Sequence, residues 1–348
     1  MANFSSLQTW DLSTPKFDAE TQEFYDGVVD MFFRFREGHL GRFCFSSALS
    51  PDDKVRGDEH WTKFIATTKF YYPYHDQIEI IRQSAPQIGQ AVADAKTFID
   101  LGTGSINSFE RKVLPILRAA NFEKIIFVDL CNTFSNLATA RLKQEKIQLS
   151  TSTFIGNFFS ELPAPSDKAA INLFGITLGN LVVDLPRETP EQVLAKAMKH
   201  FTAPLAKHGG YFVFDYDTNE DEQSIHAGYE HPSYHAMEMT VLERVKRDLP
   251  TKNFNPDDFE HKTVWYPQWR LLAQELFTKK DVRFDLGPHD IWLPKGASFR
   301  TGSSFKYPDE MIERTARQAG FDEFRVFRTP NSTMRVAVAA IHTPRHSL

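Results

Sequence analysis

The sequence contains little cysteine, no long hydrophobic run and no excess of one charge. Its 348 residues include only two cysteines, Cys44 and Cys131, which excludes a disulfide-rich fold and a cysteine zinc site. No stretch approaches the roughly 18 apolar residues of a membrane span, and no basic and apolar leader opens the chain. The 40 basic and 45 acidic residues form no block of like charge, which argues against nucleic acid or a membrane surface as partner. These absences predict a cytoplasmic protein.

Aromatic residues, by contrast, are abundant. The chain has 31 Phe, 10 Tyr and 5 Trp within a hydrophobic fraction of 41%, and its charged fraction of 24% is ordinary for a soluble globular protein. That aromatic surface is sufficient for a core and for the walls of a pocket. The length exceeds what one ordinary domain needs, so we expect one large domain or two interlocked ones.

Short buried runs alternate with helical patterns in the middle of the chain. We predict strands at 97–101, 124–129, 150–155, 169–174 and 210–215, and helices at 76–95, 109–120, 133–146 and 190–202. This alternation is typical of βαβ units around a parallel sheet. A helix over 308–319 and β-like runs at 324–327 and 335–341 would complete the sheet with a hairpin.

The flanking segments predict a second domain. Residues 1–75 are aromatic and irregular apart from a helix-like run at 60–66, and residues 217–306 form a long polar insertion. We therefore predict an α/β fold in which 76–216 and 307–348 build a Rossmann-like domain. The segments 1–75 and 217–306 would build an α+β substrate-binding domain, with the active site in a crevice that closes on binding.

The strongest chemical motif follows the first predicted strand. The run Asp100-Leu-Gly-Thr-Gly104 ends a buried strand in a Gly-x-Gly turn, where Gly102 and Gly104 let the backbone approach a ligand. The next strand ends at Asp129, whose carboxylate can accept hydrogen bonds from two ribose hydroxyls. Because ligands bind at the carboxyl edge of such sheets, we expect a nucleoside-containing cofactor there.

Phe158 and Asn157, which follow the third predicted strand, support a nucleoside-containing cofactor. Phe158 could stack on an adenine, and Asn157 could hydrogen-bond its exocyclic amine. The dinucleotide fingerprint needs a third glycine where this chain has Asn107, which disfavours a nicotinamide-dependent oxidoreductase. The turn resembles instead the first motif of class I S-adenosylmethionine-dependent methyltransferases, among which an O-methyltransferase is a rival. A plain glycine turn without a cofactor is the alternative, because a lone Gly-x-Gly is a weak signal.

A second glycine-containing turn ends the fourth predicted strand. In Phe174-Gly-Ile-Thr-Leu-Gly-Asn180, two glycines flank a polar tip that would lie beside the methyl group of the cofactor. Asn180 can both donate and accept hydrogen bonds, which suits an α-amino acid head group. The alternative is a glycine-rich turn with a capping Asn.

Five short segments occur in a specific order: Lys-Phe-Tyr-Tyr-Pro at 69–73, Asp-Leu-Gly-Thr-Gly at 100–104, Gly-Ile-Thr-Leu-Gly-Asn at 175–180, Phe-Glu-His at 259–261 and Arg-Thr-Gly-Ser-Ser-Phe-Lys-Tyr at 300–307. Together they resemble the histidine Nα-methyltransferase family of ergothioneine biosynthesis, relatives of which methylate tryptophan-type amino acids. The resemblance covers most of the chain from about residue 60 onward.

The resemblance implies roles for individual residues and no metal. S-adenosylmethionine would be held by Gly102, Thr103, Gly104, Asp129, Asn157 and Phe158, with Asn157 standing where the family usually has Asp. The carboxylate and amine of the substrate would be held by Tyr71 and Asn180, which are the expected catalytic residues. Tyr229 resembles a further substrate contact, and Ser304 matches a serine near the substrate side chain.

Two departures from the family pattern bear on specificity. The family's glutamate that reads an imidazole falls at Gly302, and a methionine beside it falls at Gln274. Losing a carboxylate that pairs with an imidazole N–H costs about 1.5–3 kcal/mol, so histidine recognition would weaken roughly tenfold to a hundredfold. Glycine in place of glutamate also leaves more space for the substrate side chain, and Gln274 could hydrogen-bond a ring N–H or hydroxyl.

We therefore predict an N-methyltransferase of secondary metabolism that acts on the α-amine of a free aromatic L-amino acid of tryptophan or tyrosine type, or a derivative, and not on histidine. Transfer requires a neutral amine in line with the methyl group, and no general base stands out. Two alternatives stay open: a histidine Nα-methyltransferase, or a non-catalytic Rossmann-like binding protein. The histidines at 226, 231 and 235 fit a solvated helix surface better than a zinc site. The expected partner is a small amino acid, and a monomer is compatible with the sequence.

Overall fold

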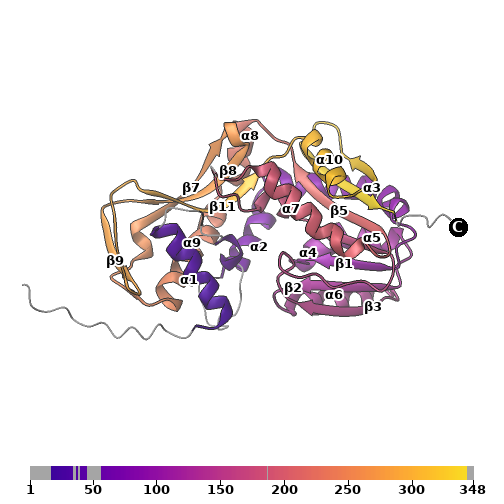
Figure 1. Cartoon of the computed structure of the whole chain (residues 1–348), viewed down its shortest axis with the longest axis horizontal. Helices are drawn as coiled ribbons and strands as arrows, with labels where there is room; N and C mark the ends of the chain where they lie inside the picture. The colour runs from indigo at the N-terminus through magenta and orange to yellow at the C-terminus, as the bar shows by residue number, and fades with distance from the viewer. Residues whose placement is uncertain (1–16, 34–36, 38–39, 45–55, 186, 343–348) are drawn as a thin grey trace, which may run out of the picture.

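The computed structural model describes residues 17–33, 37, 40–44, 56–185 and 187–342. Figure 1 shows two halves lying side by side along the long axis of the molecule. One half contains a seven-stranded sheet, and the other contains two three-stranded sheets with helices packed against them.

The seven-stranded sheet has the order β12-β13-β5-β4-β1-β2-β3. Its strands are β1 (Thr97–Leu101), β2 (Lys124–Asp129), β3 (Ser150–Ile155), β4 (Ala169–Leu173), β5 (Gly210–Asp217), β12 (Glu323–Phe327) and β13 (Met334–Ile341). The first five strands pair in parallel, whereas β13 is antiparallel to both β5 and β12. The prediction of a Rossmann-like parallel sheet completed by a C-terminal hairpin is confirmed.

The central strands are buried along their whole length, and the edge strand β3 is largely exposed. Burial on both faces explains why β1, β4 and β5 have nearly continuous apolar sequences rather than alternating ones. Because the parallel strands point the same way, the turns after β1, β2, β3 and β4 all meet at one edge of the sheet.

Helices cover both faces of this sheet. They are α3 (Tyr72–Ala91), α4 (Ile106–Ser108), η2 (Phe109–Val113), α5 (Leu114–Ala119), α6 (Thr133–Gln144), η3 (Thr177–Asn180), α7 (Pro190–Thr202), η4 (Ala203–Leu205) and α10 (Asp309–Gln318). Apolar residues of α3, α5 and α6 share one core cluster, and those of α7 and α10 share another. A capping box of Thr189 and Gln192 fixes the start of α7, with Pro190 at its first position.

The other half is built from elements of two segments that are far apart in the sequence, 19–67 and 222–305. Its strands are β6 (Thr251–Lys252), β7 (Phe259–Tyr266), β8 (Leu271–Thr278), β9 (Val282–Leu286), β10 (His289–Leu293) and β11 (Ser298–Phe305), in the orders β10-β9-β6 and β11-β8-β7. Its helices are α1 (Ala19–Phe32), η1 (Gly41–Cys44), α2 (Gly57–Thr67), α8 (Glu222–Tyr229), α9 (Pro232–Asp248), η5 (Pro256–Asp258) and η6 (Pro267–Trp269).

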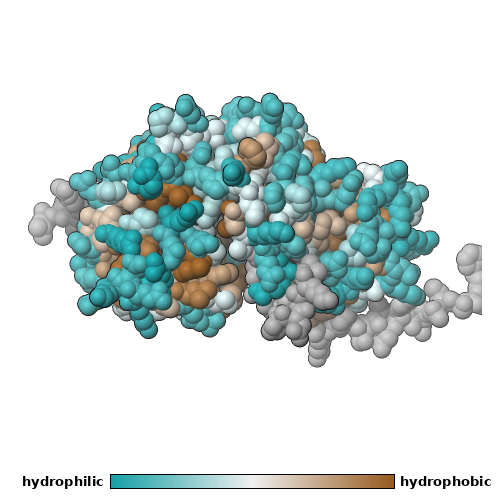
Figure 2. All heavy atoms as spheres, turned by 180° about the vertical axis from the view of Figure 1, so that it is seen from behind, coloured by the Kyte–Doolittle hydropathy of each residue, from teal (hydrophilic) through white to brown (hydrophobic). Residues whose placement is uncertain are grey.

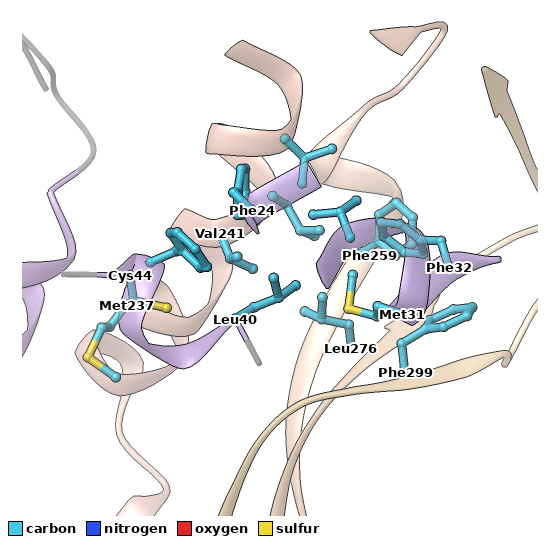
Figure 3. Packing of buried hydrophobic residues seen from close by; sticks show 14 of the residues in the cluster. Phe24, Met31, Phe32, Leu40, Cys44, Met237, Val241, Phe259, Leu276 and Phe299 are labelled. Carbon is cyan, nitrogen blue, oxygen red and sulfur yellow. The ribbon is translucent and has the colours of Figure 1, made fainter. Parts of the chain in front are cut away.

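Helix α1 corrects the expectation that the N-terminal segment is irregular. Asp18 caps the helix by accepting a hydrogen bond from the Thr21 N–H at 2.7 Å. Phe24 and Phe32 are buried against residues of α9, β7, β8 and β11, as Figure 3 shows for the cluster that they share with Met31, Leu40, Met237, Val241, Phe259, Leu276 and Phe299. The helix therefore joins the N-terminal segment to the inserted one in a single core.

The back of the molecule is mostly hydrophilic, and its hydrophobic atoms show mainly on the left of Figure 2, over the half with the seven-stranded sheet. Across the described residues, no helix combines the length and the apolar character that crossing a membrane requires.

Candidate active site

The glycine turn after β1 has the backbone conformation that its sequence indicates. Gly102 and Gly104 have φ angles of +66° and +63°, and the Gly102 N–H donates to the carbonyl of Val128 at 2.8 Å. A Cβ at Gly102 would lie 3.4 Å from the ring carbon Cε1 of Phe158. The ring of Phe158 thus lies beside the turn, so the structure brings together two residues that the sequence assigned to one cofactor.

The next strand places Asp129 at the same edge. Its carboxylate accepts a hydrogen bond from the Leu130 N–H at 2.7 Å, and its carbonyl accepts one from the Gly156 N–H at 2.9 Å. The second bond connects the end of β2 to the loop that carries Asn157. Burial raises the pKa of Asp129.

The side chain of Asn157 stabilises the turn in which it lies. Its Oδ1 accepts a hydrogen bond from the Phe159 N–H at 3.0 Å, which closes a tight turn after β3. An amide oxygen has a second lone pair and the amide nitrogen two hydrogens, so the side chain still has hydrogen-bonding capacity for a ligand.

Buried polar atoms without partners lie beside the glycine turn. Asp100 accepts a hydrogen bond from Asn172 Nδ2 at 2.8 Å through Oδ1, whereas its Oδ2, the Oγ1 of Thr103 and the Oδ1 of Asn172 have none within the described chain. Burial raises the pKa of Asp100 to about 6. One edge of the sheet thus combines a glycine turn, a carboxylate, an aromatic ring and unsatisfied polar atoms. These features fit a nucleoside with a polar tail, such as S-adenosylmethionine.

The turn after β4 is strained and held by a buried carboxylate. Ile176 has φ +59°, a conformation that is rare for a β-branched residue. Both oxygens of Asp215 accept its N–H at 3.0 Å, and one also accepts the Gly175 N–H at 3.2 Å. Burial raises the pKa of Asp215 to about 6, against the opposing influence of Lys112. Strain that is held in this way is common at functional sites.

The same turn packs against strand β11. A Cβ at Gly179 would lie 2.9 Å from the carbonyl oxygen of Phe305, so only glycine permits this approach. Asn180 follows directly, with an exposed side chain at the end of η3. The structure therefore places Asn180 beside β11, the strand that carries Ser304.

Tyr71 and Tyr229 meet in the buried centre of the other half. Their rings contact edge to face with centroids 5.3 Å apart, and both side chains are buried. Burial raises the pKa of Tyr71 well above its usual range. The Tyr71 phenol therefore stays protonated and keeps its hydrogen-bond donor.

A buried lysine organises the neighbouring polar groups. The ammonium of Lys306 lies 2.9 Å from Asp217 Oδ2 and donates to Tyr229 Oη at 3.3 Å and Ser304 Oγ at 3.2 Å. The hydroxyl of Tyr72 also donates to Asp217 Oδ2, at 2.6 Å. Burial opposes the charged ammonium, but Asp217 and Tyr229 together outweigh burial and raise the pKa of Lys306. The side chains of Lys306 and Asp217 are fully buried.

Sequence reasoning missed Lys306, Asp217 and Asp215. A signal for the two carboxylates existed, because both stand at the carboxyl end of the buried strand β5, where ligands bind in such sheets. Tyr72, next to Tyr71, donates to Asp217 and so supports the buried ion pair.

Gly302 and Gln274 face each other across strands β11 and β8. A Cβ at Gly302 would lie 3.7 Å from Cγ of Gln274, an ordinary contact distance, so the Gln274 side chain lies beside the space that a larger residue would fill. Gln274 is buried, and its Oε1 lies 3.2 Å from Nε2 of His261. Burial lowers the pKa of His261 to about 3, so this imidazole is neutral.

His226 and His231 have separate environments. His231 caps α9 by accepting the Ser233 N–H at 3.1 Å, and His226 contacts Thr263 Oγ1 at 3.1 Å. Within the described ranges no group of three or more His, Cys, Asp or Glu could hold a metal ion. Trp265 is buried in the aromatic core, whereas Trp269 is exposed against Tyr266.

Comparison with known proteins decides the family. Residues 52–341 match histidine-specific, S-adenosylmethionine-dependent methyltransferases. The chain belongs to this family. The histidine-specific methyltransferase family accounts for the glycine turn, for the carboxylate at the end of β2 and for the predicted resemblance, which is confirmed. The chain is therefore an S-adenosylmethionine-dependent methyltransferase.

Relatives with curated names act on another amino acid. The chain is 23% identical over 287 residues to the 4-dimethylallyltryptophan N-methyltransferase ifgB of Penicillium roqueforti, covering 77% of this chain and 82% of that protein. It is also 23% identical over 291 residues to the 4-dimethylallyltryptophan N-methyltransferase easF of Arthroderma benhamiae, covering 78% and 82%. The solved CcbJ methyltransferase of Streptomyces caelestis matches 75% of this chain and 94% of its own with 14% identity and a TM-score of 0.39. The fold assignment rests on the strand order described above.

Proposed function

We propose that this methyltransferase acts on the α-amine of a free L-amino acid with an aromatic side chain of tryptophan or tyrosine type, or a derivative, and not on histidine. The observation that carries the proposal is the pairing of Gly302 with Gln274, because no carboxylate is present at either position to bind an imidazole N–H. The names of the relatives as tryptophan-derivative N-methyltransferases support the same substrate class.

The cofactor would lie along the edge of the seven-stranded sheet. Gly102, Thr103 and Gly104 would admit its amino-acid end, where unpartnered polar atoms lie. Asp129 would accept from the ribose hydroxyls, and the adenine would rest between Phe158 and Asn157. When bound, S-adenosylmethionine supplies an electrophilic methyl group on a positively charged sulfur.

The head group of the substrate would be held where the two halves meet. Tyr71, protonated because it is buried, would donate to the carboxylate, and Asn180 would bind the amine and carboxylate from the turn beside β11. Tyr229 and Ser304 would complete the contact, fixed in place by Lys306. The amine must lose its proton before transfer, and this arrangement orients its lone pair.

We further propose that the segments 1–75 and 217–306 act as a substrate-binding domain on the domain built from 76–216 and 307–348. The shared core of α1, α9 and β11 supports this division. An active site between the two would close when both ligands bind.

Histidine is the competing substrate, and the description of the matched family favours it. The test offers purified protein and S-adenosylmethionine with each of the twenty L-amino acids, 4-dimethylallyltryptophan and simple tyrosine derivatives. Mass spectrometry identifies the methylated product and the number of methyl groups. An aromatic amino acid as best substrate supports the proposal, whereas methylated histidine as main product contradicts it. Binding of S-adenosylmethionine without any product would favour the non-catalytic alternative.

A further inference from the structure

A chain of side-chain contacts runs from Gln274 to a carboxylate nearer the surface. Gln274 Oε1 lies 3.2 Å from His261 Nε2, and His261 Nδ1 lies 2.8 Å from His235 Nδ1. The chain ends at Glu230, whose Oε2 lies 3.1 Å from His235 Nε2. Two histidines on β7 and α9 therefore connect the substrate-facing amide to Glu230.

The chemistry of these groups permits only two arrangements of protons. Glu230, when ionised, can only accept, so His235 must donate to it through Nε2. If His235 is charged, its Nδ1 also donates, and neutral His261 accepts at Nδ1 and donates to Gln274 Oε1 through Nε2. If His235 is neutral, it still donates to Glu230, but the other two bonds reverse: His261 donates through Nδ1, and Gln274 must present its NH₂ group to His261 Nε2.

We propose that His261 and His235 are positioning residues that set which end of the Gln274 amide faces the substrate ring, an inference that rests on the proposed function. With His235 charged, Gln274 directs its NH₂ group toward the ring and favours a ring acceptor such as a hydroxyl oxygen. With His235 neutral, Gln274 directs its carbonyl toward the ring and favours a donor such as an indole N–H. One proton on His235 thus changes the ring chemistry that the pocket accepts.

The surroundings of His235 define which groups influence this proton. Glu230 also accepts from Thr263 Oγ1 at 3.1 Å, and His226, which contacts the same hydroxyl, lies 3.8 Å from Glu222. The ring of Tyr234 on α9 lies 6.0 Å from that of His261.

The charged or titratable side chains nearest in sequence to these two histidines lie on the same two elements. Glu238, on the same helix as His235, is buried, and burial raises its pKa to about 7. Lys262 and Glu260, which flank His261 on β7, pair with each other at 2.6 Å.

The first arm of the test needs no substrate. Full-length protein labelled with ¹⁵N-histidine is examined by two-bond ¹H–¹⁵N correlation at pH 6.0 and 8.5, a range in which histidine side chains change charge. The expected result is a neutral His261 that carries its hydrogen on Nε2 at low pH and on Nδ1 at high pH. A single His261 tautomer across this range overturns the proposal, whatever the enzyme methylates.

The second arm measures the consequence for substrates. The ratio of kcat/KM for tryptophan to that for 3-benzothienyl-alanine, in which sulfur replaces the ring N–H, should rise about fivefold to tenfold from pH 6.0 to 8.5. Using a ratio cancels the titration of the α-amine, which both substrates share. A ratio that stays constant while the His261 tautomer changes contradicts the claim that Gln274 reads the ring.

A matched pair of variants separates this role from simple packing. Glu230→Gln gives His235 a partner that can donate or accept, so the pH dependence of the ratio should fall to within about twofold. Glu222→Gln changes a neighbouring carboxylate that does not belong to the series of contacts from Gln274 to Glu230. This variant should keep the wild-type pH dependence of the ratio. Equal loss of the dependence in both variants would overturn the proposal. If no amino acid is methylated at all, the proposed function fails, and the tautomer measurement still decides the orientation of Gln274.

Discussion

The proposed cofactor edge, made of the turns after β1, β2 and β3, and the proposed substrate cluster of Tyr71, Tyr229 and Lys306 are organised in opposite ways. At the cofactor edge, short consecutive segments after β1, β2 and β3 each contribute their residues through the turn that ends the strand, as Gly102 and Asp129 do. In the substrate cluster, Tyr71, Tyr229 and Lys306 come from three distant segments and are held together by burial and one ion pair. The turns take their form from residues that are close in sequence, whereas the buried charge network depends on contacts between residues that are far apart in sequence.

The largest expected effect concerns the ion pair. Lys306→Met leaves Asp217 buried without its counter-charge, and breaking such a pair costs about 3–5 kcal/mol. The free energy of unfolding, measured by urea denaturation, should fall by that amount. Lys262→Met, which removes an exposed partner of Glu260, should change it by less than about 0.5 kcal/mol.

A double variant makes this prediction specific. Lys306→Met combined with Asp217→Asn removes both charges, so the loss should be clearly smaller than the sum of the two single losses. Additive losses would mean that the two groups do not depend on each other, and the contrast between the two regions would disappear.

The next effect concerns the cofactor edge alone. Asp129→Ala removes the proposed acceptor for the ribose hydroxyls, so affinity for S-adenosylhomocysteine should fall about 30-fold, which corresponds to about 2 kcal/mol. Isothermal titration calorimetry measures it, with exposed Asp257→Ala as the control. Unfolding should change little, because Asp129 stands at the end of its strand. Unchanged affinity in Asp129→Ala would remove this carboxylate from the cofactor site.

The smallest of the three effects concerns the substrate head group. Tyr71→Phe keeps the ring contact with Tyr229 and removes one hydroxyl, so KM for the amino acid should rise about tenfold with cofactor affinity unchanged. Tyr74→Phe removes a hydroxyl from the first turn of α3, which Tyr71 precedes, and keeps the ring that faces Lys112, so it should behave like wild type. Equal behaviour of the two variants would contradict a role for the Tyr71 hydroxyl.

Local patterns in the sequence predicted the seven-stranded sheet well. Buried apolar runs mark β1 and β2 to the residue, because strands that are covered on both faces have little polar sequence. The predicted bounds of β3 are also exact, although this edge strand is polar and largely exposed. The helix expected over 109–120 begins earlier, at Ile106, and runs through η2 into α5. Helix α1 was missed although Asp18 gives an N-cap signal, because its apolar residues pack on strands far along the chain.

The candidate site could be predicted only in part, for a related reason. Residues that act through a turn, such as Gly102, carry their conformation in the local sequence. Lys306 and Asp217 are far apart in sequence, and only the fold brings the residues after β11 to the end of β5, where the Tyr307 N–H also donates to the Asp217 carbonyl at 2.8 Å. Spacing alone contains no information about such a pairing, so the ion pair appears only in the structure.

The central claim is that the Gly302–Gln274 pair directs the enzyme to aromatic substrates. The most direct measurement is a one-tube competition between equimolar tryptophan and histidine, with S-adenosylmethionine, for wild type and Gly302→Glu. A Cβ at position 302 meets Gln274 at an ordinary distance, so the first atom of the new side chain causes no clash. Wild type should methylate mainly tryptophan, and Gly302→Glu should shift the product ratio toward histidine by about tenfold or more. Methylhistidine as the main wild-type product, with no shift in the variant, would contradict the account.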